Sequence, residues 1–353
     1  MRRLEPELAF VLSSVAAFFA SEKRQALASS ATAVNNWNLV VELADHHRLV
    51  FLLHDVMAAS EWPGVPDATR NKLRAMRTAG AARYEFLGKE IPEVLSLFGK
   101  SGLKPLLFRG PFFARRYYGD PSLRQCDDLD IMVSSSEYLS AAEVLRTTGY
   151  SARPGLALSE EMDYVRRGWS VSFSRPTGCS AIDISIRLLP VNYAIPEQYE
   201  FWAQGAQSVE FDGARALVPL PHKTLLATAL HGYKHLWKRL VWLADIAAIS
   251  KSETPESLAP AWREAEALGA GRIMSFGFGL AKRMGWIGPH ERPEKDTRRM
   301  FEAQADYALL LAREAGGRPA NRLLDFVFQA SLRDSAGDML RFASAMLGNR
   351  RKV

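Results

Sequence analysis

Two short stretches of this chain alternate carboxylates with apolar residues, and this alternation most constrains the fold. In "DLDIMV", Asp128 and Asp130 are separated by a leucine, and in "AIDISIRL" Asp183 lies between two isoleucines. Side chains two positions apart on a β-strand point to the same face of the sheet. If the two strands are neighbours, one face is apolar and covered by helices, and the other gathers all three carboxylates.

Three neighbouring carboxylates repel one another and resist ionisation, and no lysine is close to them in the sequence. A divalent ion resolves this conflict, because Mg²⁺ binds one or two protein carboxylates together with phosphate oxygens. Such ions activate an attacking oxygen and stabilise a leaving one in phosphoryl chemistry. The pattern therefore indicates a Mg²⁺ (or Mn²⁺) site at Asp128, Asp130 and Asp183. An Asp-x-Asp pair alone is a weak motif.

The segment before the first carboxylate strand has the features of a phosphate site. A short apolar run, "KPLLF", leads into Arg109-Gly110-Pro111 and a helical "FFARRYYG". Proline suits the first position of a helix. A helix N-terminus presents backbone N–H groups to phosphate, and glycine allows a close approach. Arg109 can neutralise phosphate charge.

The hydrophobic pattern divides the 353 residues into three parts. Helical spacing dominates residues 1–100, strands and helices alternate over 101–220, and helical spacing returns over 221–353. We therefore predict an α+β chain with an α/β core between two helical regions. The net charge of +6 permits a phosphate-bearing or nucleic-acid partner without requiring one.

The cysteines and the N-terminus indicate a cytoplasmic protein. Cys126 and Cys179 are the only cysteines, and their spacing matches neither a zinc site nor a disulfide framework. Glu5 and Glu7 interrupt the region before the first apolar run, which favours a buried helix over a signal peptide. No apolar run is long enough to cross a bilayer, so we expect no membrane partner.

The order of these features resembles the DNA polymerase β-type nucleotidyltransferase superfamily, and more narrowly a bacterial group known as "nucleotidyltransferase family protein". That group shows Lys-Gly, Tyr, an Arg shortly before Asp-x-Asp, then "DLH" and a helical "HxxxHxWxRLxWLxD". The corresponding stretches here are "FRGPFFARRYYGDPSLRQCDDLDIMV", "AIDISIRLL" and "LHGYKHLWKRLVWLADIA", and "NWNLVVELADHHRLVFLLHDVM" also matches. The chain departs from the pattern at Arg109, Pro111 and Ser185, where the group has Lys, another residue and His.

The resemblance implies a polymerase β-like core, which is a mixed sheet with helices on one face. It also implies Mg²⁺-dependent transfer of a nucleoside monophosphate from an NTP, with ATP expected, and release of pyrophosphate. Asp128 and Asp130 would hold the metal, and Asp183 would complete one site and help to deprotonate the acceptor. Arg109 and Gly110 would hold the β- and γ-phosphates. The acceptor (a small molecule, a protein side chain or an RNA end) stays open.

Two further candidates come from the same resemblance. Without the resemblance, Arg124 would be interpreted as a surface arginine. The resemblance implies that it contacts the nucleotide or has a structural role. His231 and His235 are four residues apart on an expected helix, with Trp242 and Asp245 on the same stripe. A zinc site needs a third ligand, so a hydrogen-bonded structural stripe is favoured. In the functional alternative, His235 lines the nucleotide cleft.

Two other functions stay open at this stage. The departures at Arg109, Pro111 and Ser185 motivate a degenerate, non-catalytic protein that binds a nucleotide or a partner. The basic net charge allows a toxin-like nucleotidyltransferase that modifies RNA, although the chain has no dense Lys/Arg stripe and no strong nucleic-acid signature.

Overall fold

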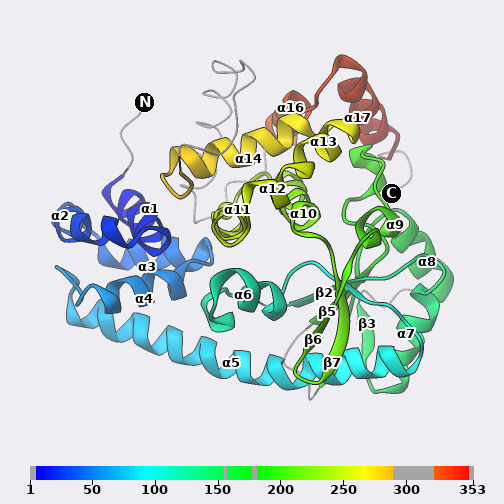
Figure 1. Cartoon of the computed structure of the whole chain (residues 1–353), viewed down its shortest axis with the longest axis horizontal. Coiled ribbons are helices and arrows are strands. Elements are labelled where there is room, and N and C mark those ends of the chain that lie inside the picture. Colours follow the sequence, from blue (N-terminus) through cyan, green and yellow to red (C-terminus); the bar gives the residue numbers. More distant parts are fainter. Residues whose placement is uncertain (1–4, 127, 154–156, 177–180, 289–321, 350–353) are drawn as a thin grey trace.

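The computed structural model describes residues 5–126, 128–153, 157–176, 181–288 and 322–349. They form one mixed sheet surrounded by helices, so the predicted α+β class is confirmed (Figure 1). The sheet has seven strands in the order β3-β4-β5-β2-β1-β7-β6. The strands are β1 (Leu106–Leu107), β2 (Asp128–Met132), β3 (Ser151–Arg153), β4 (Val171–Ser174), β5 (Ala181–Ser185), β6 (Gln207–Phe211) and β7 (Ala214–Val218).

Five helices precede the sheet: α1 (Pro6–Phe19), α2 (Leu27–Ala31), α3 (Trp37–His46), α4 (Val50–Ala59) and α5 (Asp67–Lys100). Those between the strands are α6 (Pro111–Tyr118), α7 (Tyr138–Thr147), α8 (Leu158–Arg166) and α9 (Tyr199–Ala203). Those that follow are α10 (Pro221–Lys234), α11 (Val241–Ser252), α12 (Pro255–Leu258), α13 (Pro260–Ala267), α14 (Gly271–Arg283), α16 (Arg322–Ser331) and α17 (Ala336–Asn349). Short 3₁₀ turns are η1 (Ser21–Ala26), η2 (Pro121–Leu123) and η3 (Val191–Tyr193).

The predicted pairing of the two carboxylate strands is confirmed. β2 lies parallel to β5, with Asp130 opposite Asp183 and Leu129 opposite Ile182. The apolar residues of both strands are buried in a cluster with side chains of α5, α7 and α8. The carboxylates occupy the other face and are only partly buried. One face of the sheet is therefore covered by helices, and the opposite face presents the acids.

The two helical regions that flank the core in sequence pack together in space. One hydrophobic cluster contains buried residues of α1, α3 and α4 together with those of α10, α11 and α14. The indole of Trp286 donates a hydrogen bond to the Leu12 carbonyl at 3.0 Å, and Val241 N donates to His47 O at 3.2 Å. The N- and C-terminal helices thus share one core, and α5 runs beneath these helices and the sheet (Figure 1).

The segment expected as one long helix or a helix pair is a pair, α10 and α11. Leu236 and Trp237 separate the helices and adopt left-handed φ angles of 59° and 54°. Trp237 is 1% exposed, and its ring packs against Gly232, where a Cβ atom would lie only 2.1 Å from it. Trp237 is therefore a packing residue of the core. The prediction that His231, Trp242 and Asp245 share one helical stripe is wrong, because the turn between α10 and α11 changes the direction of the chain.

Other sequence expectations have mixed outcomes. α5 ends at Lys100, and Gly102 just after it has a φ of 73°. β3, α8 and α9 were not predicted. The stretch "DTRRMFEAQADYALLLAREAGG", for which the sequence predicts a helix, lies outside the described residues. No helix in the described ranges is both long enough and apolar enough to cross a membrane.

Candidate functional site

The carboxylate cluster is held by the register of two neighbouring strands. Adjacent strands lie about 4.8 Å apart, so pairing Asp130 with Asp183 brings these side chains together on one face. Asp128 lies two residues before Asp130 and shares that face. Asp127, which precedes them, lies outside the described residues.

The pKa values of two of these carboxyls reflect the crowding of charge. Burial first, and then the charge of Asp130, raises the pKa of Asp128 from 3.8 to about 6. The charge of Arg109 opposes this rise. Burial also raises the pKa of Asp183, although hydrogen bonding to Ser172 lowers it in part. The cluster thus has a strong demand for positive charge.

The Arg109-Gly110 turn lies against the same acids. Arg109 places Nη2 at 2.9 Å and Nε at 3.1 Å from Asp130 Oδ2, so it forms an ion pair through both nitrogens. Gly110 has a φ of 91°, a conformation that favours glycine, and it precedes α6. Pro111 occupies the first helical position, as predicted. Because proline lacks an N–H group, it removes one donor from this helix N-terminus.

His231 and His235 lie side by side at the end of α10. Their ring centroids are 4.5 Å apart, and the His235 ring stacks on Trp242 at 5.0 Å. Burial lowers the pKa of His231 well below its usual value. Part of His235 is exposed, but loss of water and then the charge of Lys234 lower its pKa to about 3. Both rings are therefore neutral near pH 7.

Arg124 lies in a buried ion pair. Its Nε and Nη2 atoms each donate to the Asp245 carboxylate at 2.8 Å, and Tyr118 Oη donates to the same carboxylate at 2.8 Å. The Asp245 side chain is 0% exposed and that of Arg124 is 8% exposed. This pair joins the segment before β2 to α11, which corresponds to the structural alternative for Arg124.

A family of uncharacterised nucleotidyltransferases is described by a model that matches residues 33–285, well over half of the chain. The chain belongs to this nucleotidyltransferase family. No curated protein and no solved structure matches it. The nucleotidyltransferase resemblance is therefore confirmed at the level of the family. The placement in the polymerase β-type superfamily, and its specific core, remain predictions.

The three acids suit Mg²⁺ in their chemistry but do not form a complete site. Within the described ranges, no three His, Cys, Asp or Glu side chains converge as a ready-made metal site. Mg²⁺ commonly takes only one or two protein carboxylates and completes its shell with water and substrate phosphate. Asp128, Asp130 and Asp183 offer oxygen donors of that kind.

Two cations that interact with the three acids were not identified from the sequence. Burial lowers the pKa of Lys234, and the charges of Asp130 and Asp183 oppose that fall, so this lysine interacts with the acids although it is far from them in the sequence. Arg48 lowers the pKa of Asp128 by its charge. Lys234 ends α10, and Arg48 follows α3 with a left-handed φ of 57°. No local sequence signal connects either residue to the acids, because both reach them through tertiary packing.

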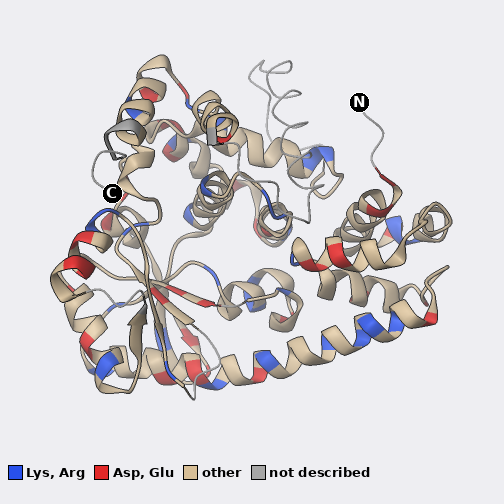
Figure 2. Cartoon of the chain, turned by 180° about the vertical axis from the view of Figure 1, so that it is seen from behind, with Lys and Arg blue, Asp and Glu red and all other residues tan. Residues whose placement is uncertain are grey.

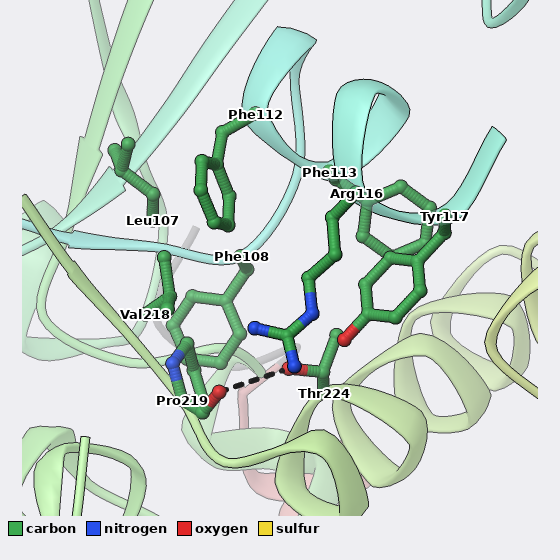
Figure 3. Close-up of a pocket in the computed structure, with 9 residues that line it drawn as sticks. All are labelled: Leu107, Phe108, Phe112, Phe113, Arg116, Tyr117, Val218, Pro219 and Thr224. Carbon is green, nitrogen blue, oxygen red and sulfur yellow. Dashed lines mark hydrogen bonds between the residues drawn. The ribbon is translucent and has the colours of Figure 1, made fainter. Parts of the chain in front are cut away.

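A small cavity beside the Arg109-Gly110 turn is almost closed by the side chains that line it. Figure 3 shows it between β1, α6 and the start of α10, where Thr224 Oγ1 donates to Pro219 O at 3.4 Å. Its volume is about 10 Å³, which is room for one water molecule at most. The lining residues are Leu107, Phe108, Phe112, Phe113, Arg116, Tyr117, Val218, Pro219 and Thr224. A nucleotide therefore has no room on this flank of the turn.

The arginines of α5 make contacts within the chain. Figure 2 shows Lys and Arg prominent along the part of α5 beneath the N-terminal helices. Arg77 forms ion pairs with Asp55 at 3.0 Å and Asp120 at 3.1 Å, and Arg74 lies over the Trp62 ring. This helix does not offer a row of uncommitted arginines to nucleic acid.

Proposed function

We propose that the protein transfers a nucleoside monophosphate from an NTP to an acceptor and releases pyrophosphate. The family supports nucleotidyl transfer as the chemistry. The observation that carries the proposal is the parallel register that sets Asp130 beside Asp183, with Asp128 on the same face. ATP is the expected NTP. The acceptor is a small molecule, a protein side chain or an RNA end.

The three aspartates would hold Mg²⁺ or Mn²⁺ together with the nucleotide. When bound, the ion would supply positive charge to the phosphate and to the attacking oxygen. Asp128 and Asp130 come from one strand, so they would act as a unit. A cation at Asp130 competes with Arg109, which now pairs with that carboxylate. Arg109, if released from Asp130, would be able to contact phosphate, for which its planar guanidinium is well suited.

Asp183 would accept the proton of the attacking hydroxyl. Burial raises its pKa towards neutrality, which strengthens it as a base, while Ser172 keeps the carboxylate oriented through a hydrogen bond. Gly110 and the first turn of α6 would present backbone N–H groups to the phosphates. His235, neutral and stacked on Trp242, offers an uncharged ring at the edge of the nucleotide site.

Labelled nucleotides test this proposal. The protein is incubated with Mg²⁺, each of four NTPs labelled at the α-phosphate, and cell extract, and label transfer is followed by mass spectrometry with pyrophosphate release. Asp183→Asn is expected to lower transfer by about 10²–10⁴-fold, because it removes a positioned base. Asp163→Asn is the matched control, since Asp163 is 68% exposed and pairs only loosely with Arg166 at 3.8 Å. Unchanged transfer by a folded Asp183→Asn variant would contradict the proposal.

A second candidate is a non-catalytic protein that binds nucleotide. The Arg109–Asp130 ion pair favours it, because it places a protein cation against one of the acids. Pro111 and Ser185 also depart from the family pattern. Saturable binding of an NTP with no pyrophosphate release under any acceptor condition would support this candidate over the enzyme.

A further inference from the structure

A larger cavity lies between three segments outside the sheet: the residues around η3, the junction of α13 and α14, and α17. Its volume is about 410 Å³, which is within the range of small-molecule sites. The charged residues of its lining are Arg187, Asp338 and Arg341, and its apolar residues include Val191, Ile195 and Leu268.

This cavity lies on the same side of the sheet as the acids. Met132 follows Asp130 by two residues, shares its face, and is buried in one hydrophobic cluster with Ile195 of the cavity wall. Arg187 follows Asp183 by four residues, which span at most about 14 Å of chain. One extended small molecule can therefore reach both the cavity and Asp183.

Arg187 has hydrogen-bonding capacity that the protein does not use. Its Nη2 donates to Ile195 O at 3.2 Å, but its buried Nε makes no hydrogen bond in the described part of the chain. Glu197 Oε1 lies 3.7 Å from that Nε, and the Glu197 carboxylate accepts instead from Leu189 N at 2.9 Å and from the Trp202 indole at 2.7 Å. A guanidinium with an unused N–H group beside a cavity favours an anionic ligand.

A second buried guanidinium lies against the same wall. Arg333 is 0% exposed, and its Nη2 donates at 3.3 Å to the carbonyl of Ala194, a lining residue. Within the described ranges, neither its Nε nor its Nη1 makes a hydrogen bond. Asp338 in the lining is already engaged by Ser335 and Arg341. Three arginines and two carboxylates thus lie at or behind the wall, which leaves one positive charge for an anion.

The walls are held in place by contacts with the rest of the fold. Tyr193 Oη donates to the Lys234 carbonyl at 3.1 Å, which ties η3 to the end of α10. Asp334, between α16 and α17, accepts a hydrogen bond from Gly271 N at the start of α14 at 2.7 Å. A preformed cavity requires little ordering when a ligand binds, which favours affinity.

We propose that this cavity binds the acceptor of nucleotidyl transfer, and that the acceptor is a small molecule whose carboxylate or phosphate group is held by Arg187. This inference rests on the proposed function and names the class of its acceptor. The acceptor would extend from the cavity to Asp183, while the nucleotide occupies the acids and the Arg109-Gly110 turn. A cavity of about 410 Å³ admits a small molecule but not a folded protein or an RNA helix.

The anion site is tested first, without nucleotide. Inorganic phosphate and acetate are the probes, and binding is measured as the concentration dependence of the melting temperature. Arg187→Gln is expected to raise Kd by about 10- to 100-fold, the size of one charge-assisted contact. Arg166→Gln is the matched control and should bind like wild type, since Arg166 is 65% exposed and lies 3.8 Å from Asp163. Arg109→Gln should also keep this binding, which separates the cavity from the turn.

A second variant does not depend on the contacts of Arg187. Ala267 lines the cavity and is exposed, so the indole of Ala267→Trp should obstruct the cavity without entering the core. This variant is expected to lose binding of the probe anions and to keep NTP binding. It should lower label transfer from NTP in cell extract by about 10-fold or more, because the acceptor no longer binds.

The outcomes separate this inference from the proposed function. If neither anion binds to wild type, or if Arg187→Gln or Ala267→Trp binds them like wild type, the inference is wrong and the proposed function stands. The inference is also wrong if Ala267→Trp loses anion binding but transfers label like wild type, since the cavity then holds an adventitious ion only. If wild type transfers label from none of the four NTPs, the proposed function falls, and the acceptor site falls with it.

Discussion

Asp128 bears much of the electrostatic cost of the acidic cluster. Its pKa is raised from 3.8 to about 6, so the folded protein resists its ionisation more than the unfolded chain does. A raised carboxyl pKa lowers stability as the pH rises through the interval between the unfolded and folded values. The free energy of unfolding is therefore expected to lose up to about 3 kcal/mol from this group between pH 4 and pH 7.

Asp128→Asn should remove this loss. We expect the variant to be more stable than wild type by about 1–3 kcal/mol at pH 8 and nearly equal to it at pH 4, without added metal. Urea unfolding at both values measures the difference. Asp163→Asn, at an exposed site, should change little at either pH. A destabilised Asp128→Asn at pH 8 would show that the carboxylate has a partner that outweighs the repulsion.

At the scale of elements, the turn between α10 and α11 fixes Lys234 and His235 in place. Trp237 packs on Gly232, and a Cβ atom there would lie 2.1 Å from the indole ring. Gly232→Ala is expected to destabilise the protein by about 1–3 kcal/mol, since overpacking displaces a buried ring. It should also weaken NTP binding, because the end of α10 must shift.

Thermal or urea unfolding with nucleotide titration measures both effects. Gly99→Ala is the matched control, since Gly99 lies in α5 with no atom within 4 Å of an added Cβ. This control should be neutral or slightly stabilising, because alanine favours helix more than glycine does. If Gly232→Ala unfolds like the control, the tight packing of Trp237 does not set the geometry of the turn.

The face of the sheet that carries the acids could be predicted, because the alternation of apolar residues and aspartates is a local property of the sequence. Leu129 and Ile182 alternate with aspartates, and the strand period of two then assigns each side chain to a face. β1 and β3 are too short to show such a period, and β3 was missed. Left-handed φ angles at Leu236 and Trp237 have no sequence signature, since neither residue is glycine or asparagine.

The sequence likewise predicted only part of the site. The three acids and the turn at Gly110 lie within or beside strands whose pattern is visible in the sequence. Lys234 and Arg48 reach the acids only because α10 and the end of α3 pack around them, which depends on contacts between distant segments. The pairing of Arg124 with Asp245 depends on such contacts as well.

At the scale of the whole molecule, the shared core makes the two helical regions depend on each other. The indole of Trp286 is 1% exposed and bonds to a carbonyl of α1. A protein that lacks residues 1–66 should therefore expose the apolar faces of α10, α11 and α14. We expect it to lose the cooperative urea transition of the full chain, as measured by near-ultraviolet circular dichroism.

A matched comparison is the full chain with Glu61→Ala, a change at the surface just before the deletion point, which should unfold cooperatively. A truncated protein that unfolds cooperatively and binds NTP would mean that the sheet and C-terminal helices form a unit of their own.

Helix α5 gives the molecule a fixed internal spacing. It has 34 residues, roughly 50 Å of helix, and none of its described residues between Leu73 and Leu87 is buried. Exposed positions in that span that make no contact can change with little effect. Arg74 and Arg77 make contacts there, and a Cβ added at Gly80 would lie 2.1 Å from the Phe51 ring. Inserting or deleting one residue there would rotate one end against the other by about 100°. Arg48 and Asp128, on elements near opposite ends, would then lose their alignment, so the number of residues in this span matters more than their identity.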